Sequence, residues 1–325
     1  CMQCRQAHIN TNTIDFVRDK FEKEGADIWF YKDVSYFLPP DTKCSHCGGS
    51  QFQKEMDIFD VWFESGSSHH AVLQKRSELS YPADLYLEGT DQHRGWFQLS
   101  LLPSVGAWDR APFKSVLTHG FVVDEQGKKM SKSRGNFLSV EDAVKEFGAD
   151  VLRLWTSSLD YQNDMSVSRN LIVRCSDAYR RIRNTFRYLL SNLYDFDPKI
   201  NTVTYEGLLE IDRWALHKTQ ELIKNVTSAY DSLLFHRVFH TIYNFCTVEM
   251  SAFYLDILKD RSYTFAKNSK ERRAGQTVMY SILLNLVKLS APILVHTAEE
   301  VWSAIIHKGE DAASVHLATF PKENP

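Results

Sequence analysis

The chain has 325 residues, with 38 Lys and Arg against 41 Asp and Glu, and a formal net charge of −3. Its 43% hydrophobic and 24% charged residues are ordinary for a globular protein and exclude bulk disorder. The length predicts two or three domains, and no apolar run approaches the roughly 18–20 residues that a membrane span needs. The near-neutral charge balance gives by itself no reason to expect a polyanionic partner.

Four of the six cysteines form two C-x-x-C pairs, Cys1 with Cys4 and Cys44 with Cys47. Two sulfurs at this spacing can converge on one ion, which is typical of tetrahedral thiolate ligation of zinc. A Gly-Gly dipeptide follows the second pair and permits a tight knuckle. The 39 residues between the pairs leave room for an inserted helix and strand. We therefore predict a structural Cys4 zinc site, with two unmetallated thiol pairs as the alternative.

Three regions differ in their residue pattern. Residues 1–56 are polar and carry the paired cysteines, residues 57–164 mix short apolar runs with glycine turns, and residues 165–325 show helical periodicity. The sequence therefore predicts an α/β region followed by an all-α region. The expected domains are a zinc-binding segment, a doubly wound catalytic part and an antiparallel helical bundle.

The middle region predicts strands that lead into glycine turns, at residues 56–63 (MDIFDVWF), 84–88 (DLYLE) and 114–123 (KSVLTHGFVV). A turn is expected at residues 124–127. Ser139 with an acid three residues later forms a capping-box pattern that predicts a helix start. We expect this helix to break near Gly148 and to resume through Trp155.

The last region predicts a succession of helices. A stripe at three- and four-residue steps marks a core-facing surface, formed by Tyr179, Ile182, Phe186, Leu189 and Leu193. Further helices are expected at about residues 211–228, 237–260, 271–289 and 297–305. Five arginines lie between Arg174 and Arg187 against a single acid, so this helix carries a local basic patch, or alternatively an ordinary solvated face.

Residues 128–136 (KKMSKSRGN) place four cations and two hydroxyls on one glycine-flanked loop. Such a loop suits a polyphosphate clamp, because ammonium groups can follow negative charge as it builds on a leaving pyrophosphate. The string KMSKS resembles the signature of class I aminoacyl-tRNA synthetases. Residues 87–97 (LEGTDQHRGWF) resemble the aminoacyl-adenylate-binding stretch of the isoleucyl-tRNA synthetase family. Similar stretches occur at residues 57–68, 119–121, 177–184 and 293–302, so the resemblance covers nearly the whole chain.

The resemblance implies a role for each matching residue. The signature residues Lys129, Met130, Ser131, Lys132 and Ser133 would form the ATP loop, with Lys132 on the phosphates and Lys129 supporting it. Glu88 would bind the α-ammonium group of the aminoacyl-adenylate, and Gly89, Asp91 and Gln92 would line its ribose and aminoacyl end. Trp62 and Trp96 would wall the isoleucine pocket, although core packing is the simpler interpretation without the resemblance. His119 is expected either on the adenine side or as an ordinary core histidine.

The resemblance also implies partners. ATP with Mg²⁺, isoleucine and the isoleucine tRNA would be substrates, and Arg180, Arg183 and Arg187 would contact tRNA phosphates. The fold would be the C-terminal half of a class I Rossmann-type nucleotide-binding fold with a zinc-binding insertion, followed by a helical anticodon-binding domain. We expect a cytoplasmic enzyme that is monomeric when intact and has no membrane partner.

Two family features do not occur in this sequence: the His-x-Gly-His signature and the inserted editing domain. We therefore expect a section of a larger enzyme that needs its N-terminal half as a partner and is inactive alone. A section specific for valine or leucine is one alternative. A non-catalytic, zinc-containing RNA-binding protein derived from a synthetase is another.

Overall fold

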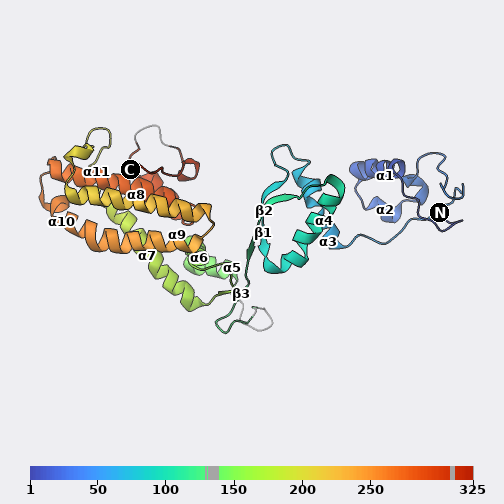
Figure 1. Ribbon diagram of the computed structural model, residues 1–325, viewed down its shortest axis with the longest axis horizontal. Coiled ribbons are helices and arrows are strands. Elements are labelled where there is room, and N and C mark those ends of the chain that lie inside the picture. The colour runs from blue at the N-terminus through green and yellow to red at the C-terminus, as the bar shows by residue number, and fades with distance from the viewer. Residues whose placement is uncertain (129, 131–138, 308–311, 325) are drawn as a thin grey trace. The chain divides into compact units, whose positions relative to one another are not determined.

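The computed structural model describes residues 1–128, 130, 139–307 and 312–324 (Figure 1). The residues form two compact units. The first unit comprises Cys1–Asp84 and Gln92–Lys114, and the second comprises Leu85–Asp91 and Ser115–Pro325. The domain boundaries expected at residues 56 and 164 stay a prediction. Within the described residues, no helix is long and apolar enough to cross a membrane.

The cysteine-bearing part of the first unit is held by a small aromatic core. It contains α1 (Thr11–Glu24), α2 (Ile28–Tyr31) and the 3-10 helix η1 (Val34–Phe37). The side chain of Asn10 accepts a hydrogen bond from the Thr13 N–H and so begins α1. Phe37 is buried, and its ring centroid lies 4.9 Å from that of Trp29. The expected inserted helix is therefore present, whereas residues 1–56, all of which are described, contain no strand.

The rest of the first unit is helical where a strand was expected. It contains α3 (Val61–Gly66), the π-helical turn η2 (His69–Leu73) and α4 (Trp96–Trp108). The prediction of a strand at residues 56–63 is wrong, because the Asp60 carboxylate accepts the Trp62 N–H and caps α3. Gly66 permits α3 to approach α4, since a Cβ there would lie 2.2 Å from the Leu99 carbonyl oxygen.

The strands form two short sheets. β1 (Ala83–Gly89) pairs with β2 (Phe113–His119), and β3 (Val122–Val123) pairs in parallel with β4 (Met165–Ser166). The prediction at residues 84–88 is confirmed. The single strand predicted at residues 114–123 is instead broken at Gly120, where the chain changes partner from β1 to β4. Asp124 and Gly127 close the predicted turn with a backbone hydrogen bond.

Two helices lead from the signature loop region into the bundle. These are α5 (Val140–Phe147) and α6 (Ala149–Ser158), separated by Gly148 as predicted. The Ser139 side chain accepts the Asp142 N–H at 3.0 Å, which confirms the predicted helix start. Gly148 has φ +87°, a backbone conformation that favours glycine at the end of a helix.

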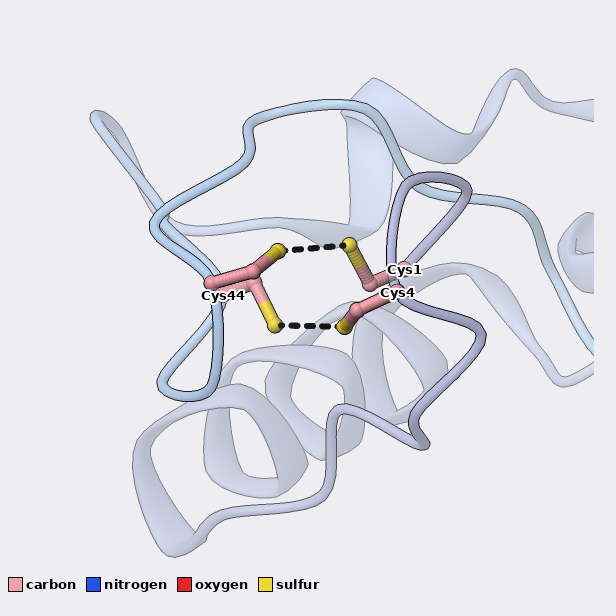
Figure 2. A group of neighbouring side chains, drawn as sticks. Cys1, Cys4 and Cys44 are labelled. Carbon is pink, nitrogen blue, oxygen red and sulfur yellow. Dashed lines mark hydrogen bonds between the residues drawn. The ribbon is translucent and has the colours of Figure 1, made fainter.

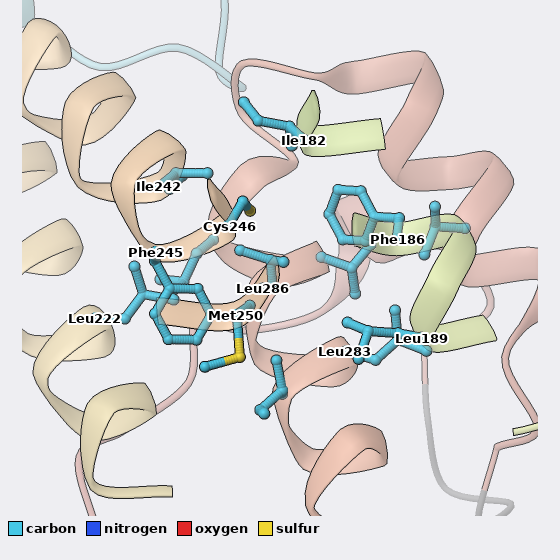
Figure 3. Packing of buried hydrophobic residues seen from close by; sticks show 14 of the residues in the cluster. Ile182, Phe186, Leu189, Leu222, Ile242, Phe245, Cys246, Met250, Leu283 and Leu286 are labelled. Atoms are coloured by element: carbon cyan, nitrogen blue, oxygen red, sulfur yellow. The ribbon is translucent and has the colours of Figure 1, made fainter. Parts of the chain in front are cut away.

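The helical region is built around one apolar core (Figure 3). Its long elements are α7 (Arg169–Asn192), α8 (Glu210–Asp231), α9 (Phe235–Asn244), the π-helical segment η6 (Phe245–Tyr254), α10 (Leu255–Thr264), α11 (Lys270–Ser290) and α12 (Val295–Ala304). Short 3-10 turns of this region occur at η5 (Tyr205–Gly207) and η7 (Val315–Leu317), whereas η3 (Thr90–Arg94) directly follows β1. Of the predicted stripe on α7, Ile182, Phe186 and Leu189 are at most 1% exposed. The helix expected at residues 237–260 is continuous but passes through the π-helical segment.

Candidate functional site

The four paired cysteines converge on one point of the first unit (Figure 2). Cys1 Sγ lies 3.6 Å from Cys47 Sγ, and Cys4 Sγ lies 3.6 Å from Cys44 Sγ. All four sulfur atoms are within 4.8 Å of one another, and none forms a disulfide. Four thiolates about 2.3 Å from a central zinc ion would be about 3.8 Å apart, so the arrangement fits a tetrahedral site.

Backbone groups prepare Cys44, the first cysteine of the second pair, for this role. The Cys44 N–H donates to the Gly49 carbonyl oxygen, and the Gly48 N–H donates to the Cys44 carbonyl oxygen, both at 2.8 Å. Gly48 adopts φ +74°, as the predicted knuckle requires. Hydrogen bonds from the backbone N–H groups of His46 and Cys47 lower the pKa of the Cys44 thiol to about 7. Such donors favour the thiolate, which is the form that binds a metal ion.

The second unit brings together four of the residues expected at the adenylate. Glu88 and Gly89 end β1, and His119 ends the neighbouring strand β2. A Cβ at Gly89 would lie 2.7 Å from Asp91 Oδ1 and 3.8 Å from His119 Cε1, so the backbone at Gly89 is the floor of this group. The Glu88 carboxylate is exposed and accepts the Gly89 N–H at 3.1 Å.

The first unit holds Gln92, Trp96 and Trp62, which are also expected at the site. Gln92 Oε1 accepts the Trp96 N–H at 3.0 Å, and the Trp96 indole N–H donates to the Ser65 carbonyl oxygen at 3.0 Å. A Cβ at Gly95 would lie 3.1 Å from the Trp62 ring. Trp62 is 45% exposed, so it is not a core residue of the first unit. Its role as a pocket wall stays a prediction.

Most of the signature loop lies outside the described residues, including Lys129, Ser131, Lys132 and Ser133. Met130 is described and packs against a small buried cluster of Val151, Val167 and Ile172. The methionine of the signature therefore packs against an apolar cluster to which α6 and α7 both contribute.

The predicted basic patch lines a cleft of the helical region. Arg180 and Arg183 border a cavity of about 480 Å³ together with His296 and Glu300. Arg183 and Arg187 also border an adjoining cavity of about 240 Å³. Arg180 forms a 2.9 Å ion pair with Asp177, and both side chains are exposed. Exposed pairs of this kind contribute little stability, so Arg180 stays available to an anionic partner.

Two positions near the site were absent from the predicted set. Gly120 donates its N–H to the Tyr161 carbonyl oxygen at 2.8 Å, and Asp164 accepts the Phe121 N–H at 2.8 Å. Both fix the backbone next to His119. Gly120 could have been suspected from its place in the H-G-F stretch, whereas nothing in the sequence marked Asp164.

Comparison with known proteins places these features in one family. The family of class I tRNA synthetases for isoleucine, leucine, methionine and valine matches residues 2–168, and the anticodon-binding domain of tRNA ligases matches residues 212–325. The chain belongs to the class I tRNA synthetase family. Its relatives include an isoleucine--tRNA ligase of Caldicellulosiruptor saccharolyticus, 55% identical over 324 residues, and one of Geobacter sulfurreducens, 53% identical over 325 residues. Each comparison covers the whole chain but 35% of the relative, so the chain spans about a third of their length.

Solved structures support the same fold at lower identity. The LeuRS of Agrobacterium radiobacter K84, in a ternary complex with tRNA and LeuAMS, has a TM-score of 0.67 and 23% identity over 87% of this chain and 35% of its own. The methionyl-tRNA synthetase of Mycobacterium tuberculosis, in complex with methionyl-adenylate, has a TM-score of 0.58 and 18% identity over 74% of this chain and 49% of its own. The expected α/β region followed by a helical region is thereby confirmed at the level of the class I synthetase fold.

Proposed function

We propose that this chain is a section of an enzyme that ligates isoleucine to its tRNA. The observation that carries the proposal is the 51–55% identity to isoleucine--tRNA ligases along 98–100% of the chain. In the first step, an isoleucine carboxylate oxygen attacks the α-phosphorus of ATP and pyrophosphate leaves. In the second step, a terminal ribose hydroxyl of tRNA attacks the adenylate carbonyl and AMP leaves. The valine- and leucine-specific alternatives remain as outcomes of the test.

The chemistry needs positioning and charge stabilisation rather than a covalent nucleophile. Glu88 is the group for the α-ammonium of isoleucine, because its carboxylate stands exposed at the end of β1. Gly89 lets the ligand approach the backbone, with Asp91 and His119 beside it. Lys129 and Lys132 would stabilise the charge of the departing pyrophosphate, with Mg²⁺ on the phosphates.

The walls of the amino-acid pocket are proposed from the first unit. Trp62 and Trp96 would exclude water from the isoleucine side chain, with Gln92 holding the start of α4. One methylene in such a pocket discriminates by only about 1–3 kcal/mol, so isoleucine and valine differ modestly in binding. This limit follows from the apolar chemistry of the pocket and not from its exact shape.

The helical region is proposed to bind tRNA. Arg180, Arg183 and Arg187 lie along one side of α7, where a phosphodiester backbone would meet three guanidinium groups. The Arg187 and Arg183 side chains carry no acidic partner among the ion pairs of the described residues. They are therefore the stronger of the three contacts, since Arg180 already pairs with Asp177.

We propose one structural zinc ion on Cys1, Cys4, Cys44 and Cys47, because the sulfur positions fit its tetrahedral coordination. The ion would hold the two knuckles together and supply no chemistry to the ligation reaction. The enzyme would act in the cytoplasm, where its ATP, amino acid and tRNA substrates meet.

A chimera tests the proposal. The homologous third of the Geobacter sulfurreducens isoleucine--tRNA ligase is replaced by residues 1–325, and ATP–pyrophosphate exchange is measured with isoleucine, valine and leucine. Exchange supported best by isoleucine is expected. Exchange supported best by valine or leucine would assign a different amino acid. No exchange from a folded, ATP-binding chimera would favour the non-catalytic RNA-binding alternative.

A further inference from the structure

We propose that Tyr161 is a positioning residue that ties the helical region to His119. The inference rests on the proposed function, because it gives His119 a role at the adenylate. It adds a link that runs from the turn between α8 and α9, through Tyr161 and the segment 160–164, to the end of β2. Each contact of this link lies within the second unit.

The link is anchored in the helical region by the Tyr161 side chain. Tyr161 is 8% exposed, and its hydroxyl donates to the Leu233 carbonyl oxygen at 2.9 Å. Its ring centroid lies 5.8 Å from that of Phe235. The turn that receives it is itself fixed, because the Leu233 N–H donates to Tyr230 O and the Leu234 N–H donates to Ala229 O. Leu233 has φ +56°, so its carbonyl direction is set by an unusual backbone conformation.

The chain after Tyr161 is locally stiff. The Asn163 N–H donates to the Asp160 carbonyl oxygen at 3.2 Å, and the Asn163 side-chain amide donates to the Asp160 carboxylate at 3.0 Å. The Asp160 carboxylate also accepts the Gln162 N–H at 3.2 Å. These bonds make residues 160–163 a turn of fixed shape, so the position of Tyr161 determines where Asn163 and Asp164 lie.

The segment 160–164 forms hydrogen bonds with the backbone of Gly120 and of the next residue, Phe121. The Gly120 N–H donates to Tyr161 O at 2.8 Å, and the Phe121 N–H donates to Asp164 Oδ1 at 2.8 Å. A Cβ at Gly120 would lie 2.3 Å from both the carbonyl carbon and oxygen of Asn163. The backbone of Gly120 therefore lies directly against the backbone of Asn163, and no side-chain rotation can relieve this contact. A shift of the turn at residues 160–163 must therefore move Gly120 as well.

His119 completes the link. Its Nδ1 pairs with the Gly120 carbonyl oxygen at 2.8 Å, which requires a proton on Nδ1, so that Nε2 of the neutral imidazole is an acceptor. Cε1, between the two ring nitrogens, would lie 3.8 Å from a Cβ at Gly89. Gly120 therefore orients the imidazole through its carbonyl group, and an Nε2 acceptor there suits a hydroxyl or amine of the nucleoside. Tyr161 acts on the ligand only through this chain of contacts.

The test uses the full-length chimera described above and two matched substitutions. Tyr161→Phe removes the hydroxyl at Leu233, whereas the control Tyr230→Phe removes an equal 2.9 Å bond from a tyrosine hydroxyl to the Leu289 carbonyl oxygen. We expect Tyr161→Phe to raise the KM for ATP in isoleucine-dependent exchange about fivefold, and Tyr230→Phe to leave it within twofold. Equal KM values for the two variants would overturn the proposal.

A double-mutant cycle separates positioning from general loosening. If Tyr161 acts through His119, then Tyr161→Phe changes the KM for ATP by less than about twofold in a His119→Ala background. An undiminished fivefold effect in that background would contradict the link. Gly120→Ala should reproduce the loss more strongly, while Gly106→Ala, where a Cβ meets no atom within 4 Å, should not.

Amide hydrogen exchange tests the link independently of catalysis. Exchange in the peptide covering residues 117–123 should accelerate in Tyr161→Phe and stay unchanged in Tyr230→Phe. A wild-type chimera without isoleucine-dependent exchange would defeat the proposed function, while faster amide exchange in Tyr161→Phe would still support the link. Unchanged amide exchange would overturn the link, whatever the catalytic result.

Discussion

Asp150 and Thr297 meet across 147 positions of sequence: Asp150 Oδ2 accepts the Thr297 N–H at 2.7 Å and the Thr297 hydroxyl at 2.6 Å. Asp150 is buried in α6, and Thr297 lies in the first turn of α12. The carboxylate thus acts as an N-cap supplied by another helix, where the helix dipole favours a negative charge. Arg153, three residues later, donates to the carbonyl oxygens of Pro292 and Ile293. Helix α6 therefore fixes the connection between α11 and α12 through one acidic side chain, Asp150, and one basic side chain, Arg153.

Removing this cap should destabilise the helical region. Asp150→Ala leaves the buried Thr297 N–H and the part-buried His296 N–H without their acceptor, and we expect the free energy of unfolding to fall by about 2–4 kcal/mol. Asp177→Ala removes an exposed carboxylate and should cost less than about 0.5 kcal/mol. Urea unfolding of both variants checks the difference, and equal losses would refute the capping role of Asp150.

Acid should weaken the helical region through Asp195. Burial raises the pKa of the Asp195 carboxyl, but hydrogen bonds from Arg272 and Gln276 outweigh it and lower the pKa to about 2. The folded state therefore binds the proton more weakly than the unfolded state, whose pKa is near 3.8. The stabilisation, about 2 kcal/mol, is present above pH 4 and is lost as the pH falls from about 4 to 2.

Asp195→Asn checks this window. The variant should be less stable than the wild type by about 3 kcal/mol at pH 7, because it leaves the buried Arg272 without its charge partner. The difference should shrink between pH 4 and pH 2. Asp256→Asn, which breaks an exposed pair with Lys259, is the control. A stability difference that is constant down to pH 2 would show that Asp195 does not titrate in this range.

The cysteine site should bind one zinc ion per chain. Cys44→Ser and Cys47→Ser should each abolish zinc retention after dialysis, as measured by elemental analysis, because three thiolates no longer complete the tetrahedron. Amide exchange should accelerate in residues 1–56 and not in the helical region. Cys246→Ala, at a buried cysteine of the helical region, should keep the zinc. Full zinc retention in Cys47→Ser would exclude the four-cysteine site.

The basic side of α7 should contribute a salt-dependent part of tRNA binding. Replacing Arg180, Arg183 and Arg187 with Gln should weaken binding by the full-length chimera and flatten its dependence on salt concentration, by about one unit of log–log slope per lost phosphate contact. Arg18→Gln, on α1, removes an exposed arginine elsewhere and is the control. Filter binding from 50 to 300 mM salt, about the range over which such slopes develop, measures both effects. An unchanged slope would leave the three arginines as ordinary surface charge.

Patterns among residues close in sequence were enough to predict much of the fold. Ser139 marked the start of α5 through its capping pattern, and the α7 stripe marked the core, because both depend on residues close in sequence. The strand predicted at residues 56–63 is wrong, because apolar residues of this kind form a strand only when a neighbouring strand pairs with them. Here Asp60 caps the helix α3 instead. The split at Gly120 was also hidden, because it depends on the approach of Asn163, 43 residues away.

The site shows the same division. The cysteine spacing was enough to predict four converging sulfurs. The resemblance grouped Gly89 with Asp91 but left His119 open between the adenine side and the core, and the structure puts His119 beside Gly89. The roles of Tyr161 and Asp164 could not be predicted, because both act through hydrogen bonds to backbone groups that are distant in the sequence. No periodicity or spacing encodes such contacts.

Charging of tRNA tests the central claim most directly. The full-length chimera is incubated with ATP, radiolabelled isoleucine and transcripts of the isoleucine, valine and leucine tRNAs, and the aminoacylated RNA is counted. The account predicts isoleucine on the isoleucine transcript, at a rate at least about 100-fold above that on the other two, and loss of charging in Lys132→Ala. Charging of the valine or leucine transcript at an equal or higher rate, or full charging by Lys132→Ala, would contradict it.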